Sequence, residues 1–384
     1  MRRILSPLIA LTMLFIAPAG LLADEEPPPL GTLPMEEASE GWILLFDGQT
    51  TFGWNIKGPA RVTDGALVLG GSSDVTAQTN SEFCCFDLTF QYYTPAKGAV
   101  LVLNGQRVDL PPSEKQRSWT QVAVHVEMQG EDRIISVAFP ADDKPTTAQD
   151  LPAQKGAART PITFQMPARG QLALRDIKLK PLAMKSLFNG KNLDGWYIVP
   201  GQKSKFTVTP KGELNIKDGG GEIQTEGQWA DFILQLDVFS NGKSLNSGIF
   251  FRALPRKFWQ GYEAQIRNEW DGYSPDPERA KRKEDRTKPH DIGTGGIYNR
   301  QPARKVVSND KEWFTYTVLA HGNHIALWVN GYQTADYFDN DKDADTARKG
   351  RFLGKGAISL QGHDPTTDLS FRNIRLQELP PAKK

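Results

Sequence analysis

The chain has 384 residues, 39% of them hydrophobic and 24% charged, which is too long for one ordinary core and suits two domains. Its 46 lysines and arginines are almost balanced by 45 aspartates and glutamates. A chain without a net positive field has little to hold a phosphate backbone, so we expect no nucleic-acid partner.

The N-terminal segment has the order of a secretory signal peptide, which we place over residues 1–23. A positively charged start precedes a short apolar stretch at residues 4–17, and small residues follow it. We expect cleavage after Ala19 or Ala23, with Ala23 favoured because an acidic stretch follows it; an uncleaved membrane anchor is the alternative. The mature protein would then be periplasmic or secreted without a membrane span, and residues 24–40 would form a flexible acidic, proline-rich leader.

The only two cysteines, Cys84 and Cys85, are neighbours in the sequence. Adjacent residues of a strand point to opposite faces, so in a strand these thiols could not easily pair. We therefore favour two small buried residues over a vicinal disulfide. Neither a disulfide framework nor a cysteine zinc site is expected.

Two long segments of the chain repeat each other. Residues 44–48, Leu-Leu-Phe-Asp-Gly, return as Ser-Leu-Phe-Asn-Gly at residues 186–190, and residues 172–179 return at residues 369–376. A period this long indicates tandem domains rather than the short units of a solenoid.

We expect the first domain over residues 40–182 and the second over residues 183–380. Both are filled with alternating or apolar segments of strand length, such as residues 313–320 and 324–329, bounded by turn residues. No stretch keeps a 3.6-residue apolar period for three turns, so helices should be few and short. Many short strands without helices between them predict antiparallel sandwiches or barrels.

The second copy carries a set of short motifs in a fixed order. They lie at residues 187–190, 246–252, 262–266, 296–298, 327–331, 360–363 and 371–374. As an ordered set they resemble the 3-keto-disaccharide hydrolase domain family, over nearly all of the second copy. The resemblance implies a concanavalin A-like jelly-roll sandwich and action on 3-keto-glycosides. We therefore expect an all-β protein made of two tandem sandwiches of this kind.

The first copy lacks the polar residues of the second. Val102 stands where the second copy has Arg252, and Met166-Pro167 replaces Gly362-His363. It also has no counterpart of the Tyr-Glu-x-Gln strand. We interpret the first copy as a sandwich without the polar site, serving as a support or a sugar-binding module.

Strand parity predicts a polar face on the second copy, because side chains two apart on a strand share a face. Glu263, Gln265 and Arg267 lie together on one strand, and Gln361 and His363 lie together on another. Arg252 is expected to share its face with Gly248 and Phe250 on a third. If these faces coincide, they form a groove; ordinary half-solvated strands with a surface ion pair are the alternative.

The resemblance to a family acting on 3-keto-glycosides suggests a specific chemistry for this groove. A ketone at C3 acidifies the hydrogen on C2, so a base can remove it and the resulting enolate can expel the C1 substituent before water adds back. We expect His363 or Glu263 to be the base. Arg252, or a divalent metal held by Glu263 and His363, would stabilise the enolate, although no cofactor is firmly predicted. The expected sugar-binding residues are Gln265, Arg267, Tyr298 and Gln361.

Other arrangements and functions remain open on the sequence. A conventional glycosidase would need a second carboxylate, and Glu269 or Asp271 reaches Glu263 only if the chain bends back. The charged insertion at residues 271–291 would be a lid over the groove or a mobile loop. We favour an exported hydrolase or lyase that cleaves the glycosidic bonds of 3-keto-glycosides or 3-keto-disaccharides. The alternatives are a non-catalytic carbohydrate-binding protein and a structural or adhesive surface protein.

Overall fold

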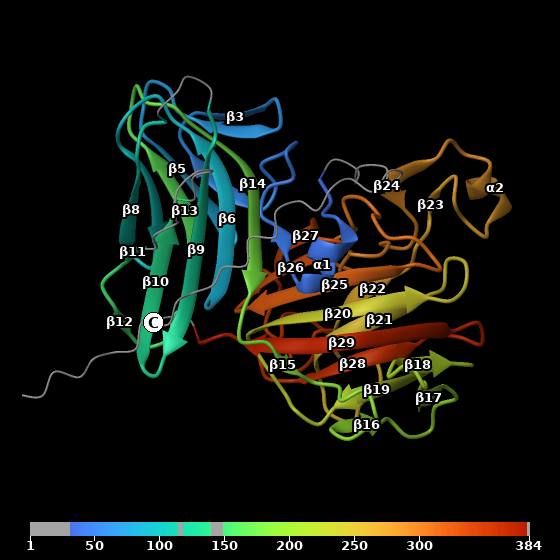
Figure 1. The fold of residues 1–384 in the computed structure, drawn as a ribbon. Helices are drawn as coiled ribbons and strands as arrows, with labels where there is room; N and C mark the ends of the chain where they lie inside the picture. The colour runs from blue at the N-terminus through green and yellow to red at the C-terminus, as the bar shows by residue number, and fades with distance from the viewer. Residues whose placement is uncertain (1–30, 114–117, 140–148, 382–384) are drawn as a thin grey trace, which may run out of the picture.

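The computed structural model describes residues 31–113, 118–139 and 149–381, and these form two tandem antiparallel β-sandwiches (Figure 1). The all-β fold class predicted from the sequence is confirmed. The predicted signal peptide over residues 1–23 lies outside the described residues. Within the described part of the chain, no helix is long and apolar enough to cross a membrane.

The first sandwich pairs a nine-stranded sheet with a five-stranded sheet. In β5 (Val75–Phe83) and β6 (Phe86–Tyr93), buried and half-buried residues alternate along the whole strand, so one face of each sheet packs on the shared core. The nine-stranded sheet contains β1 (Ile43–Leu44), β3 (Ala60–Thr63), β4 (Ala66–Leu69), β6 (Phe86–Tyr93), β9 (Thr120–Gln129), β10 (Asp132–Ala138), β11 (Gln149–Asp150), β12 (Gln154–Lys155) and β14 (Leu172–Pro181). The five-stranded sheet has the order β2 (Trp54–Lys57), β5 (Val75–Phe83), β13 (Thr160–Met166), β7 (Ala99–Leu103) and β8 (Gln106–Leu110).

The second sandwich repeats this plan with an eight-stranded and a five-stranded sheet, here called the back sheet and the front sheet. The back sheet contains β15 (Lys185–Ser186), β17 (Lys205–Val208), β18 (Leu214–Lys217), β20 (Phe232–Ser240), β25 (Trp313–His321), β26 (His324–Val329), β27 (Tyr332–Phe338) and β29 (Asp368–Glu378). The front sheet has the order β16 (Trp196–Ile198), β19 (Gly221–Thr225), β28 (Ala357–Gly362), β21 (Ser247–Ala253) and β22 (Tyr262–Ile266).

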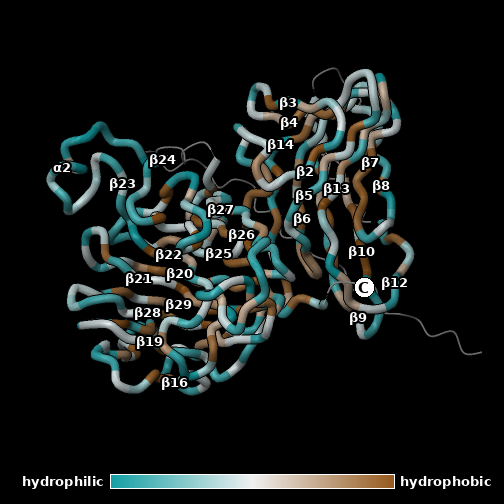
Figure 2. Tube along the Cα trace, turned by 180° about the vertical axis from the view of Figure 1, so that it is seen from behind, coloured by the Kyte–Doolittle hydropathy of each residue, from teal (hydrophilic) through white to brown (hydrophobic). Residues whose placement is uncertain are grey.

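Two short elements stand outside the sandwiches. The predicted charged insertion forms a hairpin of β23 (Trp270–Asp271) and β24 (Asp285–Pro289) around α2 (Pro277–Ala280), and Figure 2 shows this projection as mostly hydrophilic. The leader predicted as flexible over residues 24–40 is ordered at its end, because α1 (Met35–Glu40) packs beside β25 with Ala38 buried. That part of the prediction is corrected.

The first sandwich covers part of the back sheet. Ile233, Leu319 and Trp328 of the back sheet belong to the same buried apolar cluster as the first sandwich's core. The Trp328 indole N–H also donates to the Leu44 carbonyl at 2.9 Å. The contact also reaches the front sheet, where Arg252 of β21 pairs with Asp231, the partner of Arg159 in the first sandwich.

The two cysteines lie in the turn between β5 and β6, and not inside a strand. Both are buried and unbridged. The expectation that their side chains point to opposite faces of a strand is therefore wrong, whereas the expectation of two buried, unbridged cysteines is confirmed.

Candidate functional site

The outer face of the front sheet carries a layer of buried polar side chains. Glu263 and Gln265 of β22 and Ser359 and Gln361 of β28 alternate with apolar residues that face the core. Phe250 of β21 lies between them, since the strand register places it opposite both Glu263 and Ser359. The polar faces of these two strands therefore meet across β21.

A glycine makes room for the Glu263 side chain to lie across β21. A Cβ atom added at Gly248 would come within 2.6 Å of Glu263 Oε1. Gly248 stands opposite Gln265 in the ladder. Because the contact is with the carboxylate and its own side-chain carbons, any larger residue at position 248 would displace Glu263.

A second carboxylate, Glu222 of β19, is held in the same layer. Its Oε1 accepts from the Trp259 backbone N–H at 2.8 Å, and its Oε2 accepts from Ser359 Oγ at 3.0 Å and Gln224 Nε2 at 3.2 Å. Glu222 is fully buried. Glu222 was not among the residues predicted from the sequence, although residues 222–224 repeat the Glu-x-Gln pattern of residues 263–265 and alternate in the same way.

Arg348 closes the outer face above Glu263. Its guanidinium forms an ion pair with Glu263 Oε2 and lies 4.1 Å from the ring centre of Trp259, 5.0 Å from that of Phe250 and 5.2 Å from that of Tyr298. Cations are attracted to aromatic faces at such distances. Arg348 belongs to the long loop before β28. Side chains do not alternate regularly in a loop, so its position could not be predicted from the sequence.

Burial dominates the electrostatics of the two carboxylates. It raises the pKa of Glu263 above its usual value, and the charge of Glu222 acts in the same direction. The positive charge of Arg348, and more weakly that of His363, opposes this rise in the pKa of Glu263 without reversing it. Burial likewise raises the pKa of Glu222. Raised carboxyl pKa values suit groups that exchange protons near neutral pH.

The loop at residues 254–260 folds back over this face. The Arg256 N–H donates to Gln224 Oε1 at 2.7 Å, and the Arg256 guanidinium stacks 4.5 Å from the ring centre of Tyr197. Trp259 has φ +58° and is 41% exposed. A bulky residue with positive φ is strained, and such strain is commonly found at functional sites.

Two amide oxygens on this face have no hydrogen-bond partner among the described residues. They are Gln265 Oε1 and Gln361 Oε1, and both side chains are almost fully buried. Gln265 uses its amide nitrogen to donate to Asn246 Oδ1 at 2.9 Å. A buried acceptor left without a donor is costly, so the polar layer of this face is not fully satisfied by its own side chains.

The other predicted site residues lie at the rim. His363 directly follows β28, its side chain is 44% exposed, and its Nδ1 pairs with Asp364 Oδ2 at 3.0 Å. Arg267 follows β22 and forms ion pairs with Glu269 at 2.7 Å and Asp291 at 2.9 Å. Glu269 is therefore tied to Arg267 and does not act as a second carboxylate beside Glu263.

Arg252 does not belong to this face, which corrects the prediction that it shares one with Phe250. The ladder between β21 and β28 is irregular between Phe250 and Ala253, and Arg252 has φ +47°. A bulge of this kind re-aims the side chain. The buried guanidinium donates to the Ala230 carbonyl at 2.7 Å and pairs with Asp231 at 3.3 Å.

The predicted metal pair does not form a metal site in this arrangement. Glu263 is engaged by Arg348 and His363 by Asp364. Protein sites for divalent ions normally use three or more protein ligands. In the described segments, no group of three His, Cys, Asp or Glu side chains is placed to hold an ion.

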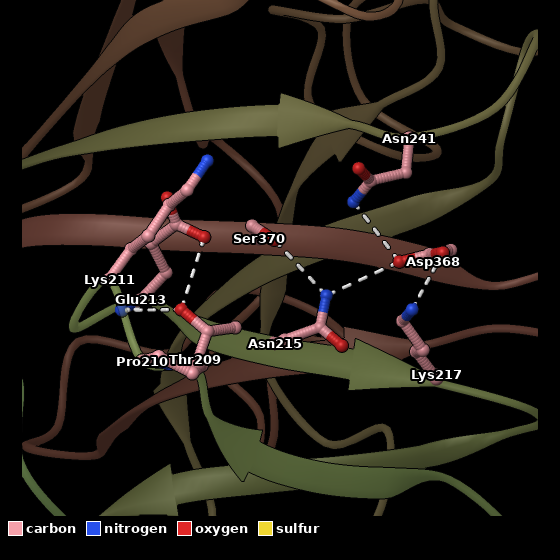
Figure 3. A pocket seen from close by; sticks show the side chains of 9 residues that line it. All are labelled: Thr209, Pro210, Lys211, Glu213, Asn215, Lys217, Asn241, Asp368 and Ser370. Carbon is pink, nitrogen blue, oxygen red and sulfur yellow. Dashed lines mark hydrogen bonds and ion pairs between the residues drawn. The ribbon is translucent and has the colours of Figure 1, made fainter.

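A separate hollow of about 350 Å³ lies on the back sheet (Figure 3). Its polar groups satisfy one another: Asn215 Nδ2 donates to Asp368 at 3.2 Å and to Ser370 Oγ at 3.1 Å, and Lys217 pairs with Asp368 at 3.1 Å. It offers no aromatic platform. We therefore place the candidate site on the front sheet.

Comparison with known proteins gives a family match over most of the chain. The model of the 3-keto-alpha-glucoside-1,2-lyase-like domain matches residues 41–155 and 183–377. This confirms the family that the second copy resembles, extends the match into the first copy, and makes the protein a carbohydrate-active one. The comparison with curated protein sequences found no match.

Solved structures similar to this chain each cover about half of it. Two are of proteins from Parabacteroides distasonis ATCC 8503 provisionally named glycosyl hydrolases. One has 22% identity, a TM-score of 0.41 and coverage of 51% of this chain and 94% of that chain. The other has 24% identity, a TM-score of 0.39 and coverage of 51% and 99%. Carbohydrate-binding module CBM66 from Bacillus subtilis has 16% identity, a TM-score of 0.34 and coverage of 49% and 98%.

Proposed function

Since this chain belongs to the 3-keto-alpha-glucoside-1,2-lyase-like domain family, we propose that it is an exported enzyme that cleaves the glycosidic bond of 3-keto-glycosides. The proposed active site is the outer face of the front sheet. The observation that carries the proposal is the buried Glu263–Arg348 ion pair, enclosed by Trp259, Tyr298 and Phe250. It combines a base, a cation and aromatic faces in one place.

The pair supplies what cleavage through an enolate needs. The Glu263 carboxylate removes the proton from C2, and the electrons of that bond form an enolate with the C3 ketone. The Arg348 cation stabilises the negative charge that develops on the ketone oxygen. Collapse of the enolate expels the C1 substituent, whose oxygen takes the proton that Glu263 holds. Water then adds across the C1–C2 double bond, so the net reaction is hydrolysis.

Neighbouring side chains are suited to hold the sugar. The exposed ring of Trp259 offers a face for stacking. A sugar hydroxyl that reached the buried oxygens of Gln265 and Gln361 would supply the hydrogen-bond donor that they lack among the described residues. Glu222 does not touch the sugar in this proposal. It positions Trp259 by accepting the backbone N–H of that residue.

One observation favours a second candidate function, non-catalytic carbohydrate binding. Trp259 is a large, exposed aromatic side chain beside buried polar groups, an arrangement that would also serve a lectin-like surface. Stacking and hydrogen bonding need no base, so turnover that depends on Glu263 would distinguish catalysis from binding.

Turnover by matched variants tests the proposal. The full chain is incubated with a 3-keto-glycoside carrying a chromogenic leaving group, and release of that group is followed. Glu263→Gln should lower kcat by roughly 10²-fold or more, whereas Glu226→Gln, an exposed glutamate on the same sandwich, should not.

His363→Gln separates the two candidate bases. If His363 is the base, its variant loses activity and Glu263→Gln keeps it, which would overturn the assignment to Glu263. Saturable sugar binding without any turnover by the unaltered protein would favour the binding function.

A further inference from the structure

A loop brings Arg348 to the proposed active site. Arg348 lies at residues 339–356, between β27 and β28, in a segment without a regular strand or helix. The position of a side chain in such a loop depends on the contacts that hold the loop backbone in place. The geometry of the Glu263–Arg348 ion pair therefore depends on what fixes this loop relative to β22.

Arg300 holds the turn of the loop that carries Arg348. Its Nη2 donates to the carbonyl oxygens of Ala347 at 3.1 Å and Gly350 at 3.3 Å, on either side of Arg348. Its Nη1 forms an ion pair with Asp341, near the start of the same loop. The Arg300 side chain is only 17% exposed. One planar guanidinium thus joins three points of the loop, a task suited to the fixed fork of arginine donors.

The other hydrogen bonds of this turn stay within the loop. The Arg348 N–H donates to Thr346 Oγ1 at 3.2 Å, and the Lys349 N–H donates to the Thr346 carbonyl at 3.1 Å. The Arg351 N–H donates to the Lys342 carbonyl at 2.9 Å. These bonds shape the turn but do not fix its place above the front sheet.

Arg300 is itself anchored to the strand that carries Glu263. It lies in a turn closed by the Arg300 N–H, which donates to the Ile297 carbonyl at 2.9 Å. Ile297 forms a β-bridge with Ala264 of β22, and the Tyr298 N–H donates to the Glu263 carbonyl at 2.9 Å. Arg300 therefore connects the backbone of Glu263 to the loop that carries its cationic partner.

We propose that Arg300 is a positioning residue that keeps the Arg348 guanidinium on the Glu263 carboxylate, a role that rests on the proposed function of this site. Without Arg300, the turn loses both carbonyl contacts and the ion pair with Asp341, and the Arg348 guanidinium no longer stays on Glu263. The positive charge that favours the ionised carboxylate is then weaker, so more of Glu263 is protonated at a given pH.

Amide hydrogen exchange of the full-length protein tests whether Arg300 holds the turn. In Arg300→Met, the amides of residues 344–351 should exchange roughly tenfold faster, whereas those of β22 should not change. Arg304→Met is the matched control, because Arg304 is 20% exposed, donates to the Gln333 carbonyl and pairs with Asp47. These partners lie outside the Arg348 loop, so its variant should leave the exchange of residues 344–351 unchanged.

The ionisation of Glu263 tests whether the held turn matters to the site, and it can be followed without turnover. Protein labelled with carbon-13 at the glutamate side-chain carboxyl is titrated by NMR, and the Glu263 resonance is the one lost in Glu263→Gln. In Arg300→Met the titration midpoint of Glu263 should rise by roughly half a pH unit or more, whereas Arg304→Met should not move it. Once Arg348 is replaced, as in Arg348→Gln, adding Arg300→Met should cause no further change.

The double variant separates positioning from a direct effect of charge. A further rise of the midpoint in it would show that the Arg300 charge acts on Glu263 directly, and an unmoved midpoint in folded Arg300→Met would show that Arg300 does not position Arg348. Either result would overturn the proposal. An unaltered protein without turnover would overturn the proposed function instead, and the titration would still test Arg300.

Circular dichroism checks that the variants are folded. If Arg300→Met does not fold, Arg300→Lys takes its place, since it keeps the charge but loses the planar fork that reaches both carbonyls. The titration midpoint of Glu263 should then still rise. A midpoint equal to that of the unaltered protein would contradict the positioning role.

Discussion

At the scale of single residues, the charge state of Glu263 depends on its immediate neighbours. The side chain is only 4% exposed, and burial raises its pKa. Arg348 opposes that shift by forming an ion pair with the carboxylate. A base must be deprotonated to act, so in the proposed mechanism Arg348 both favours the ionised form of Glu263 and stabilises the enolate.

Removing Arg348 should therefore move the acid limb of the activity profile. In Arg348→Gln the opposing charge is lost, the pKa of Glu263 rises further, and kcat/KM should begin to fall at a pH roughly one unit or more higher than in the unaltered protein. Activity at the pH optimum should also fall by roughly 10²-fold. The measurement is the pH dependence of kcat/KM.

Arg351→Gln is the matched control, since Arg351 lies in the same loop and pairs with exposed Asp343. Its acid limb should not move. If the acid limb of Arg348→Gln did not shift, Arg348 would have no effect on the ionisation of Glu263, which would contradict the prediction.

At the scale of elements, regular strands could be read from the sequence and irregular segments could not. The alternation of side chains along a strand correctly placed Glu263, Gln265 and Gln361 on one face, because β22 and β28 contain no bulge at these residues. It failed for Arg252, where a bulge breaks the period of β21. It could say nothing of Arg348, which is brought to the face by a loop whose path depends on tertiary contacts.

The loop at residues 254–260 should contribute to substrate binding through Trp259. Trp259→Ala should raise KM by roughly fivefold, because stacking on an aromatic ring contributes about 1 kcal/mol, while the free energy of unfolding should change little for a side chain that is 41% exposed. Steady-state kinetics and urea unfolding measure the two effects.

Phe258→Ala is the control on the same loop, because Phe258 is also exposed, at 37%, but makes none of the ring contacts of Trp259 with Arg348. It should leave KM unchanged. Equal KM effects in the two variants would indicate a general effect of the loop and not stacking on Trp259.

At the scale of the whole molecule, a chain of ion pairs joins the first sandwich to Arg252 of β21 in the front sheet. Arg159 of the first sandwich pairs with Glu82 at 2.8 Å and with Asp231 of the second at 2.6 Å, and Asp231 also pairs with Arg252. The sequence repeats predicted the two sandwiches. They did not predict that Arg252 would pair with Asp231, the residue that binds Arg159 of the first sandwich. The first copy therefore acts as a support in this account, and its domain boundaries remain a prediction.

Arg159→Met should destabilise the protein without changing its chemistry. It leaves partly buried carboxylates with fewer partners, so the free energy of unfolding should fall by about 2–3 kcal/mol, while kcat should stay the same. Arg61→Met, an exposed arginine of the first sandwich, should change neither. A lowered kcat in folded Arg159→Met would show that the first sandwich influences the site.

The most direct test of the central claim, that Glu263 removes the C2 proton at the front sheet, is hydrogen exchange at C2. A 3-keto-glycoside is incubated in D₂O with the full-length protein, and proton NMR follows deuterium at C2 of substrate and product. The account predicts enzyme-dependent deuterium incorporation at C2 that is roughly 10²-fold or more slower with Glu263→Gln. A product that retains its C2 hydrogen, or equal exchange by the Glu263→Gln variant, would contradict it.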